Sequence, residues 1–157
     1  MAKSKTLEFD YWISSYLAFR HAQDFRRSAE LIEKNNITKP VMVNIAFSCE
    51  LYMKALIMWN HKNREIIGEH KLDALFGMLE ISIQERIRQE TDIQNWDTFL
   101  KDSADAFCAW RYYYEKDNVM FGHIGDLFAF AEVLDSICSE EISIGEFLKD
   151  GTIGKCL

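Results

Sequence analysis

The stretch from Val41 to Trp59, VMVNIAFSCELYMKALIMW, restricts the possible fold more than any other part of the chain. It follows the only proline, Pro40, whose fixed φ suits the first turn of a helix. At about 100° per residue, most of its apolar residues form one unbroken face. The opposite side also carries Phe47, Leu51 and Met58. A helix that is apolar nearly all round is a buried one, so we expect this helix at the centre of the fold.

Two charged residues, Glu50 and Lys54, interrupt this apolar helix one turn apart. On a surface helix such a pair contributes only a few tenths of a kcal/mol. Inside a bundle a buried charge is costly unless it is paired, so both residues need partners from another helix. Arg111 is a candidate, because it occupies an apolar-stripe position and a guanidinium can bond a carboxylate with two N–H groups. Two interpretations stay open: a structural ion pair, or a pocket for an anion or phosphate group.

Length and composition favour one all-α domain. A chain of 157 residues with 48% hydrophobic residues is long enough to bury a core. One proline and seven glycines leave few breaks, whereas a fold made mostly of strands would need more turn residues. The net charge of −7 argues against a protein that coats nucleic acid generally, although it does not exclude RNA contact at one local basic patch.

Helical periodicity divides the chain into about five helices with short connections. The expected helices cover residues 7–34, 41–59, 72–87, 97–116 and 124–138. Short connections between helices favour antiparallel neighbours. We therefore predict a single-domain up-and-down bundle over residues 1–140, with residues 141–157 as a C-terminal tail.

Several sequence features indicate the cellular compartment and the cofactors that we expect. Cys49, Cys108, Cys138 and Cys156 show no metal-ligand spacing, so we expect reduced thiols in a cytoplasmic protein. No uncharged apolar stretch reaches the roughly 18 residues of a membrane helix, and the N-terminal residues turn polar too soon for a signal peptide. There is no glycine-rich phosphate loop and no metal-ligand cluster. We expect no membrane span, no metal and no cofactor.

Two histidines stand at the entries of expected helices. His70 follows Gly68, and His123 follows Gly122. Each could satisfy backbone groups at a helix start. Each could equally serve as a general acid or base, because an imidazole changes charge near neutral pH.

The segment NIAFSCELYMKAL, followed after a polar loop by GEHKLDAL, resembles the HEPN superfamily (higher eukaryotes and prokaryotes nucleotide-binding). The matching residues are Glu50, Lys54, Gly68, His70 and Leu72. The segment FCAWRYYYE, from Phe107 to Glu115, looks like the aromatic-Arg helix of a HEPN-like subgroup. The resemblance covers about residues 18–134.

The resemblance implies an all-α homodimer from a prokaryotic defence, toxin–antitoxin or stress system. Its implied partners are RNA or a nucleotide, and an antitoxin or nucleotidyltransferase protein. Many members are metal-independent RNases that use an Arg followed, after four to six residues, by a His. Here the first histidine after Arg111 is His123, whereas Arg64 and His70 have five residues between them.

Arg111 is not followed by a histidine at the spacing of these RNases, and two functions remain open. We expect a nucleotide- or RNA-binding or interaction module that lacks an intact RNase motif. Its expected binding residues are Glu50, Lys54, His70, Arg111 and Glu115. The alternative is a metal-independent RNase, in which Arg111 stabilises the developing charge and His70 or His123 activates the ribose 2′-hydroxyl.

The aromatic residues also predict a dimer. The chain has 11 Phe, 6 Tyr and 4 Trp, and several lie off the main helical stripes. Trp12, Tyr16 and Phe19 form a second face on the first helix, and Trp110 and Tyr113 do so on the fourth. Such faces commonly meet a second copy across a two-fold axis. We therefore expect a homodimer with one of these aromatic faces at its interface.

Overall fold

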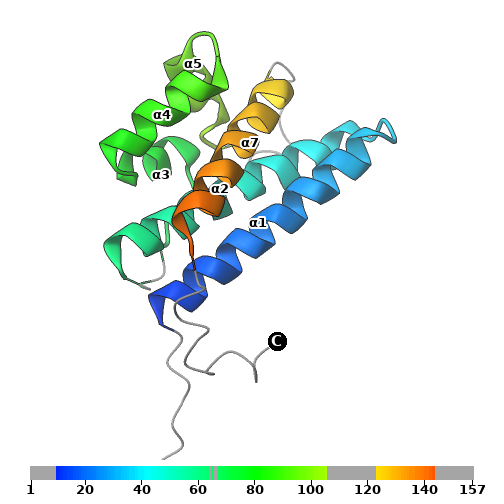
Figure 1. Ribbon diagram of the computed structural model, residues 1–157. Helices are drawn as coiled ribbons and strands as arrows, with labels where there is room; N and C mark the ends of the chain where they lie inside the picture. Colours follow the sequence, from blue (N-terminus) through cyan, green and yellow to red (C-terminus); the bar gives the residue numbers. More distant parts are fainter. Residues whose placement is uncertain (1–9, 64, 66, 106–122, 144–157) are drawn as a thin grey trace, which may run out of the picture.

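The computed structural model describes residues 10–63, 65, 67–105 and 123–143. This part of the chain forms six helices and no strand (Figure 1). The helices are α1 (Tyr11–Glu33), α2 (Thr38–His61), α3 (Leu72–Met78), α4 (Ile81–Thr91), α5 (Trp96–Ser103) and α7 (Ile124–Glu141). The predicted all-α bundle is confirmed, with one helix more than the five expected.

The two longest helices, α1 and α2, form an antiparallel hairpin that runs the length of the molecule (Figure 1). Asp10 precedes α1, and its carboxylate accepts the Tyr11 N–H at 2.7 Å. The turn between the helices includes Asn36 in the left-handed region, with φ 57°, which asparagine tolerates better than most residues. Pro40 lies in the first turn of α2, as expected.

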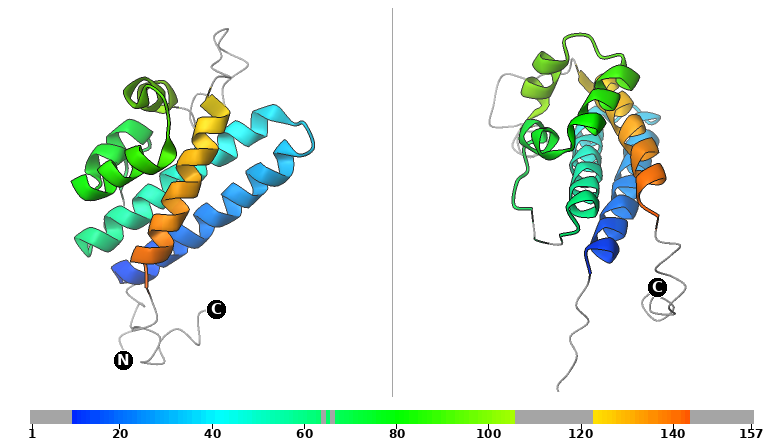
Figure 2. Two further views of the ribbon diagram at one scale, coloured as in Figure 1. Left: turned by 45° about the horizontal axis from the view of Figure 1, so that its top comes forward. Right: turned by 60° about the vertical axis from the view of Figure 1, so that its left-hand side comes forward.

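Helix α2 is the centre of the bundle. It packs against α1, α7 and α3, and Figure 2 shows it between α1 and the group of shorter helices. Tyr52, Met53 and Leu56 are completely buried, which confirms the predicted central position. Among the described helices, α2 alone is long and apolar enough to span a membrane, and most of that stretch is buried inside the bundle.

The predicted third helix is interrupted in the structure. Leu79 and Glu80 adopt extended backbone conformations and separate α3 from α4. The amide of Gln84 donates to the Leu79 carbonyl at 2.8 Å, which satisfies an acceptor that the break leaves outside a helix. The apolar periodicity continues through the break because Leu79 and Ile83 are both buried. The sequence pattern therefore predicts one continuous helix.

An aromatic cluster attaches the short helices to α7. The Trp96 ring lies 5.1 Å from Phe76 on α3, 5.4 Å from Phe99 on α5 and 5.4 Å from Phe130 on α7, measured between ring centroids. These spacings are typical of favourable edge-to-face and tilted aromatic pairs. The cluster thus fixes α3 and α5 against the main bundle.

The structure corrects one expectation about the dimer interface. Trp12 and Phe19 are 8% and 7% exposed, and the Phe19 ring lies 6.0 Å from Tyr52. Tyr16 is partly buried and packs against the same core. Helix α2 is apolar nearly all round, and it therefore buries residues of α1 that lie beside the main apolar stripe as well as those within it. These three aromatic residues of α1 therefore pack inside the chain itself, whereas Trp110 and Tyr113 lie outside the described residues.

Two of the four cysteines can be placed, and both are buried free thiols. Cys49 donates to the Leu127 carbonyl and Cys138 to the Tyr52 carbonyl, each at 3.6 Å. Burial raises the pKa of both thiols, so neither is a reactive thiolate at neutral pH. Cys108 and Cys156 lie outside the described residues.

Candidate functional site

Three of the five predicted binding residues meet at one buried carboxylate. Glu50 is 1% exposed, and its Oε1 atom lies 2.8 Å from the Lys54 ammonium. The same oxygen lies 2.9 Å from Nδ1 of His70. Helix α2 supplies the first two residues one turn apart, and the loop between α2 and α3 supplies the third. We call Glu50, Lys54 and His70 the Glu50 cluster.

The imidazole of His70 has one ring nitrogen fixed and one available. Toward an ionised carboxylate, which can only accept hydrogen bonds, Nδ1 of His70 would be the donor. Nε2 makes no hydrogen bond with any residue that the structure describes. The side chain of His70 is 56% exposed, and Nε2 is the ring nitrogen left for a ligand. When neutral it can accept a proton, and when protonated it can donate to an anion.

The loop before α3 holds His70 in place. The carboxylate of Glu69 accepts the backbone N–H groups of His70 and Lys71, each at 2.9 Å. These two hydrogen bonds lower the pKa of Glu69, which favours the ionised carboxylate that accepts both N–H groups. One residue further on, the Leu72 N–H donates to the Ala104 carbonyl at 3.0 Å, which ties the loop to the end of α5.

The second oxygen of Glu50 has no partner within the described part of the chain. Oε2 is buried and receives no hydrogen bond there. An unpaired buried acceptor is costly, so this atom calls for a donor. Arg111, the donor expected from the sequence, and Glu115 lie outside the described residues. Their pairing with this cluster stays a prediction.

A hollow of about 400 Å³ is lined by chain neighbours of the Glu50 cluster, and no member of the cluster itself lines it. Ile57, Ile67 and Met78 give it apolar walls, and Glu65 and Glu69 supply carboxylates at its edge. Ile57 lies about one turn beyond Lys54 on α2, and Glu69 is the chain neighbour of His70. The volume lies within the range of small-molecule sites, which is roughly 300–1,000 Å³.

His123, the second candidate base, has different surroundings. Its Nδ1 lies 3.2 Å from Asp126 at the start of α7, and its Nε2 lies 3.4 Å from Asp102 on α5. The ring of Phe99 packs edge-on at 5.6 Å between centroids. Both ring nitrogens therefore face carboxylates. This arrangement connects α5 to α7 and leaves no ring nitrogen free for a substrate.

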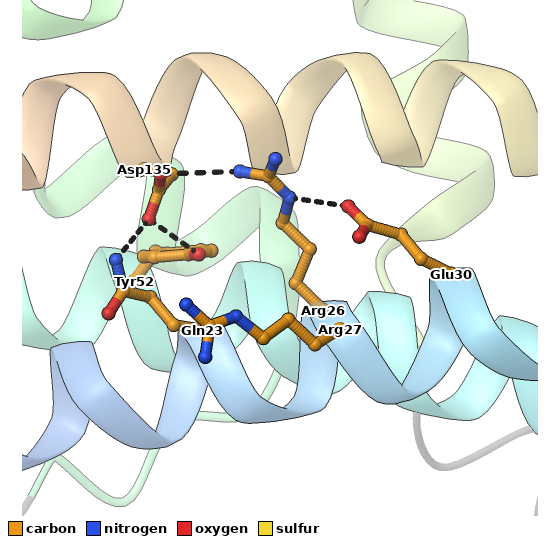
Figure 3. A pocket seen from close by; sticks show the side chains of 6 residues that line it. All are labelled: Gln23, Arg26, Arg27, Glu30, Tyr52 and Asp135. Atoms are coloured by element: carbon orange, nitrogen blue, oxygen red, sulfur yellow. Dashed lines mark hydrogen bonds and ion pairs between the residues drawn. The ribbon is translucent and has the colours of Figure 1, made fainter.

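A second polar group, centred on Asp135 of α7, was not predicted from the sequence (Figure 3). Oδ1 of Asp135 accepts from the Gln23 amide and from the Tyr52 hydroxyl, both at 2.9 Å. Oδ2 lies 3.3 Å from Arg26, whose Nε donates to Glu30 at 3.0 Å. The five residues come from α1, α2 and α7. No short motif could reveal them, because Asp135 is 83 positions from Tyr52 in the chain.

The pKa shifts in this group follow from burial and hydrogen bonding. Burial raises the pKa of Tyr52, and the charge of Asp135 and its hydrogen bond raise it further. The phenol therefore stays protonated and acts as a donor. Burial lowers the pKa of Arg26, but the hydrogen bond to Glu30 and the nearby carboxylates outweigh burial and leave it raised. Asp135 thus connects three helices through permanently available donors.

Within the ranges that the structure describes, no group of three or more His, Cys, Asp or Glu side chains could hold a metal ion. Comparison with known proteins matched the chain to no family model, no curated protein and no solved structure.

Proposed function

We propose that this protein is a HEPN-like module that binds a phosphate-bearing ligand, a nucleotide or RNA, at the Glu50 cluster. The observation that carries the proposal is the 2.9 Å contact between Nδ1 of His70 and the buried Glu50 carboxylate. This contact uses Nδ1 of a half-exposed imidazole and leaves Nε2 without a hydrogen bond to any described residue. A protonated imidazole can donate a charge-assisted hydrogen bond to a phosphate oxygen. The resemblance implies a role for the module in a prokaryotic defence, toxin–antitoxin or stress system.

The neighbouring hollow suits the rest of a nucleotide. Its apolar walls, Ile57, Ile67 and Met78, offer a surface on which a base can pack. The carboxylates of Glu65 and Glu69 can accept hydrogen bonds from the amino groups of a base, as acidic side chains do with cytosine N4. A base in the hollow and a phosphate at His70 would use both parts of the site.

Binding to a short labelled RNA and to AMP, followed by fluorescence anisotropy and calorimetry, tests this function. The variant His70→Ala removes the exposed imidazole and should weaken binding of both ligands about tenfold or more. His21→Ala is the matched control, because His21 is exposed on α1 and makes no hydrogen bond to any described residue. Equal binding by wild type and His70→Ala, or no binding by wild type, would reject the proposal.

The geometry of His70 also favours a second function, a metal-independent RNase. A carboxylate that fixes one nitrogen of a histidine while the other is free is the arrangement of a general base. His70 would then activate the ribose 2′-hydroxyl, and Arg111 would stabilise the developing charge. Of the two candidate bases, His70 is favoured because both nitrogens of His123 face carboxylates.

Incubation with total RNA in the presence of a chelator separates binding from cleavage. An RNase would cleave the RNA, and His70→Ala and Arg111→Ala would each lose the activity. His21→Ala should keep it. RNA that stays intact with wild type, while anisotropy shows binding, would identify a binding module without RNase activity.

We further propose that the protein is a homodimer and that its partners include an antitoxin or nucleotidyltransferase protein. The resemblance supports both. The exposed leucines of α1, Leu17 and Leu31, are 36% and 61% exposed and offer apolar surface for a second copy. They are about 40° apart around the helix axis, so they lie on the same side of α1.

A further inference from the structure

A polar hollow of about 140 Å³ lies between α1, α2 and α7. Since a water molecule occupies roughly 30 Å³, the hollow has room for a small polar group in place of several waters. Tyr52 lines it and lies two residues after Glu50, about 200° round α2. The hollow and the Glu50 cluster are therefore on different sides of the central helix.

The side chains around this hollow have more free donors than free acceptors. Three of the four carboxylate oxygens of Asp135 and Glu30 already accept hydrogen bonds or ion-pair contacts. Arg26 uses Nε and Nη1 in these contacts, which leaves Nη2. Gln23 uses one of the two hydrogens on its amide nitrogen. The unpaired groups are thus mainly N–H donors.

Arg27 supplies further unpaired N–H donors, because its whole guanidinium is without a partner among the described residues. It lines the hollow, is exposed, and makes no hydrogen bond or ion pair with any residue in the described ranges. In Figure 3 the side chain of Arg26 reaches across to Asp135, whereas the side chain of Arg27 runs along α1 toward Gln23. Both carboxylates are bonded to Arg26, so the charge of Arg27 is the one left for a ligand.

We propose that this hollow binds a phosphate group through Arg27, with Nη2 of Arg26 and the Gln23 amide as further donors. A guanidinium presents its N–H groups in a planar fork that matches two oxygens of one phosphate. Glu30 and Asp135 hold Arg26 from two sides, so its free edge is already oriented. The phosphate can be free in solution or part of a nucleotide. This site is independent of the function proposed for the Glu50 cluster.

Calorimetric titration of the full-length protein with inorganic phosphate, and separately with AMP, tests the site. We expect Arg27→Gln to weaken phosphate binding about tenfold or more, and His70→Ala and the control Arg88→Gln to leave it unchanged. In the His70→Ala background, where the Glu50 cluster no longer contributes, AMP binding that is tighter than phosphate binding and is lost on adding Arg27→Gln would identify a nucleotide as the source. Equal binding of the two, lost in the same variant, would identify free phosphate.

Three results would overturn the proposal: no phosphate binding by wild type, unchanged binding by Arg27→Gln, or binding lost in His70→Ala alone. The last would assign the phosphate to the Glu50 cluster. Circular dichroism shows whether Arg27→Gln folds. If Arg27→Gln does not fold, nuclear magnetic resonance of the arginine Nε–H signals in wild type tests whether phosphate binds at Arg27. Phosphate should shift the signal of Arg27 and not that of Arg88, and an unshifted Arg27 signal would reject the site.

Discussion

The carboxylate of Glu50 and the imidazole of His70 are in contact at 2.9 Å, yet the first side chain is 1% exposed and the second 56% exposed. The buried partner is fixed by the packing of α2, and it in turn fixes a side chain that faces solvent. Such an arrangement orients an exposed imidazole more firmly than a surface contact can, because surface side chains lose conformational freedom to form each contact. The stability of the core and the geometry of the candidate site are therefore coupled through one carboxylate.

Replacing Glu50 tests how much the fold depends on that carboxylate. We expect Glu50→Ala to lower the free energy of unfolding by about 1–4 kcal/mol, because it leaves the mostly buried Lys54 ammonium without its partner. Urea denaturation measures the change. The control Glu85→Ala, at an exposed position of α4, should change it by no more than about 0.5 kcal/mol. A similarly small loss for Glu50→Ala would show that the cluster does not stabilise the bundle.

A double-mutant cycle tests whether Glu50 and Lys54 act as a unit. Lys54→Met keeps the length and apolar stem of the side chain and removes the charge. Because the two groups are 2.8 Å apart, the losses for Glu50→Gln and Lys54→Met should not add. We expect a coupling free energy of about 0.5–3 kcal/mol from urea denaturation of the four proteins. Strict additivity would mean that the two side chains contribute independently.

The Asp135 group should stabilise the packing of α1, α2 and α7. Tyr52→Phe keeps the buried ring and removes one donor to Asp135, so we expect a loss of about 0.5–1.5 kcal/mol in the free energy of unfolding. Tyr16→Phe is the control, because Tyr16 is partly buried and makes no hydrogen bond to a described residue. A loss for Tyr52→Phe no larger than that for the control would contradict a stabilising role for this hydrogen bond.

The features that could be predicted from sequence are those with a local physical cause. The central helix follows from a 3.6-residue apolar period, and the burial of Glu50 follows from a helix that is apolar nearly all round; both depend only on neighbours along the chain. The sequence predicts His70 at a helix start because a glycine and polar residues precede Leu72, and it leaves the role of His70 there open. Its contact with Glu50 brings together residues 20 positions apart. The resemblance, rather than periodicity, suggested that these two residues belong to one site.

The features that could not be predicted depend on long-range packing. The break at Leu79 and Glu80 leaves the apolar period intact, so nothing in the pattern marks it. Asp135 stands beside the apolar stripe of α7 and reads as an ordinary surface carboxylate. Only the packing of α7 against α1 and α2 brings it to Tyr52 and Arg26. The position of α1 relative to α2 likewise decided that Phe19 is a core residue.

The ion pair between Arg86 of α4 and Glu140 of α7 predicts a pH dependence. The two side chains form a bidentate contact, with Nη2 2.9 Å from Oε1, and this hydrogen bonding lowers the pKa of Glu140. A lowered folded-state pKa stabilises the protein above the unfolded-state pKa, and the contribution is lost as the pH falls through the folded value. We expect Arg86→Gln to unfold at lower urea concentration than wild type at pH 7, with the difference shrinking below about pH 4. A difference that stays constant from pH 7 to pH 3 would contradict this origin.

The last prediction distinguishes the core face of α1 from its outer face. Phe19 is 7% exposed and Leu31 is 61% exposed, although both are large apolar residues on the same helix. Phe19→Glu would bury a charge against Tyr52, so we expect it to unfold the protein and abolish the helical circular dichroism signal. Leu31→Glu should keep the helical signal. Light scattering of wild type should give twice the chain mass of 18.4 kDa, and Leu31→Glu should give the monomer mass if α1 forms the interface. The control Arg88→Glu should remain dimeric, and a monomeric wild type across micromolar concentrations would reject the homodimer.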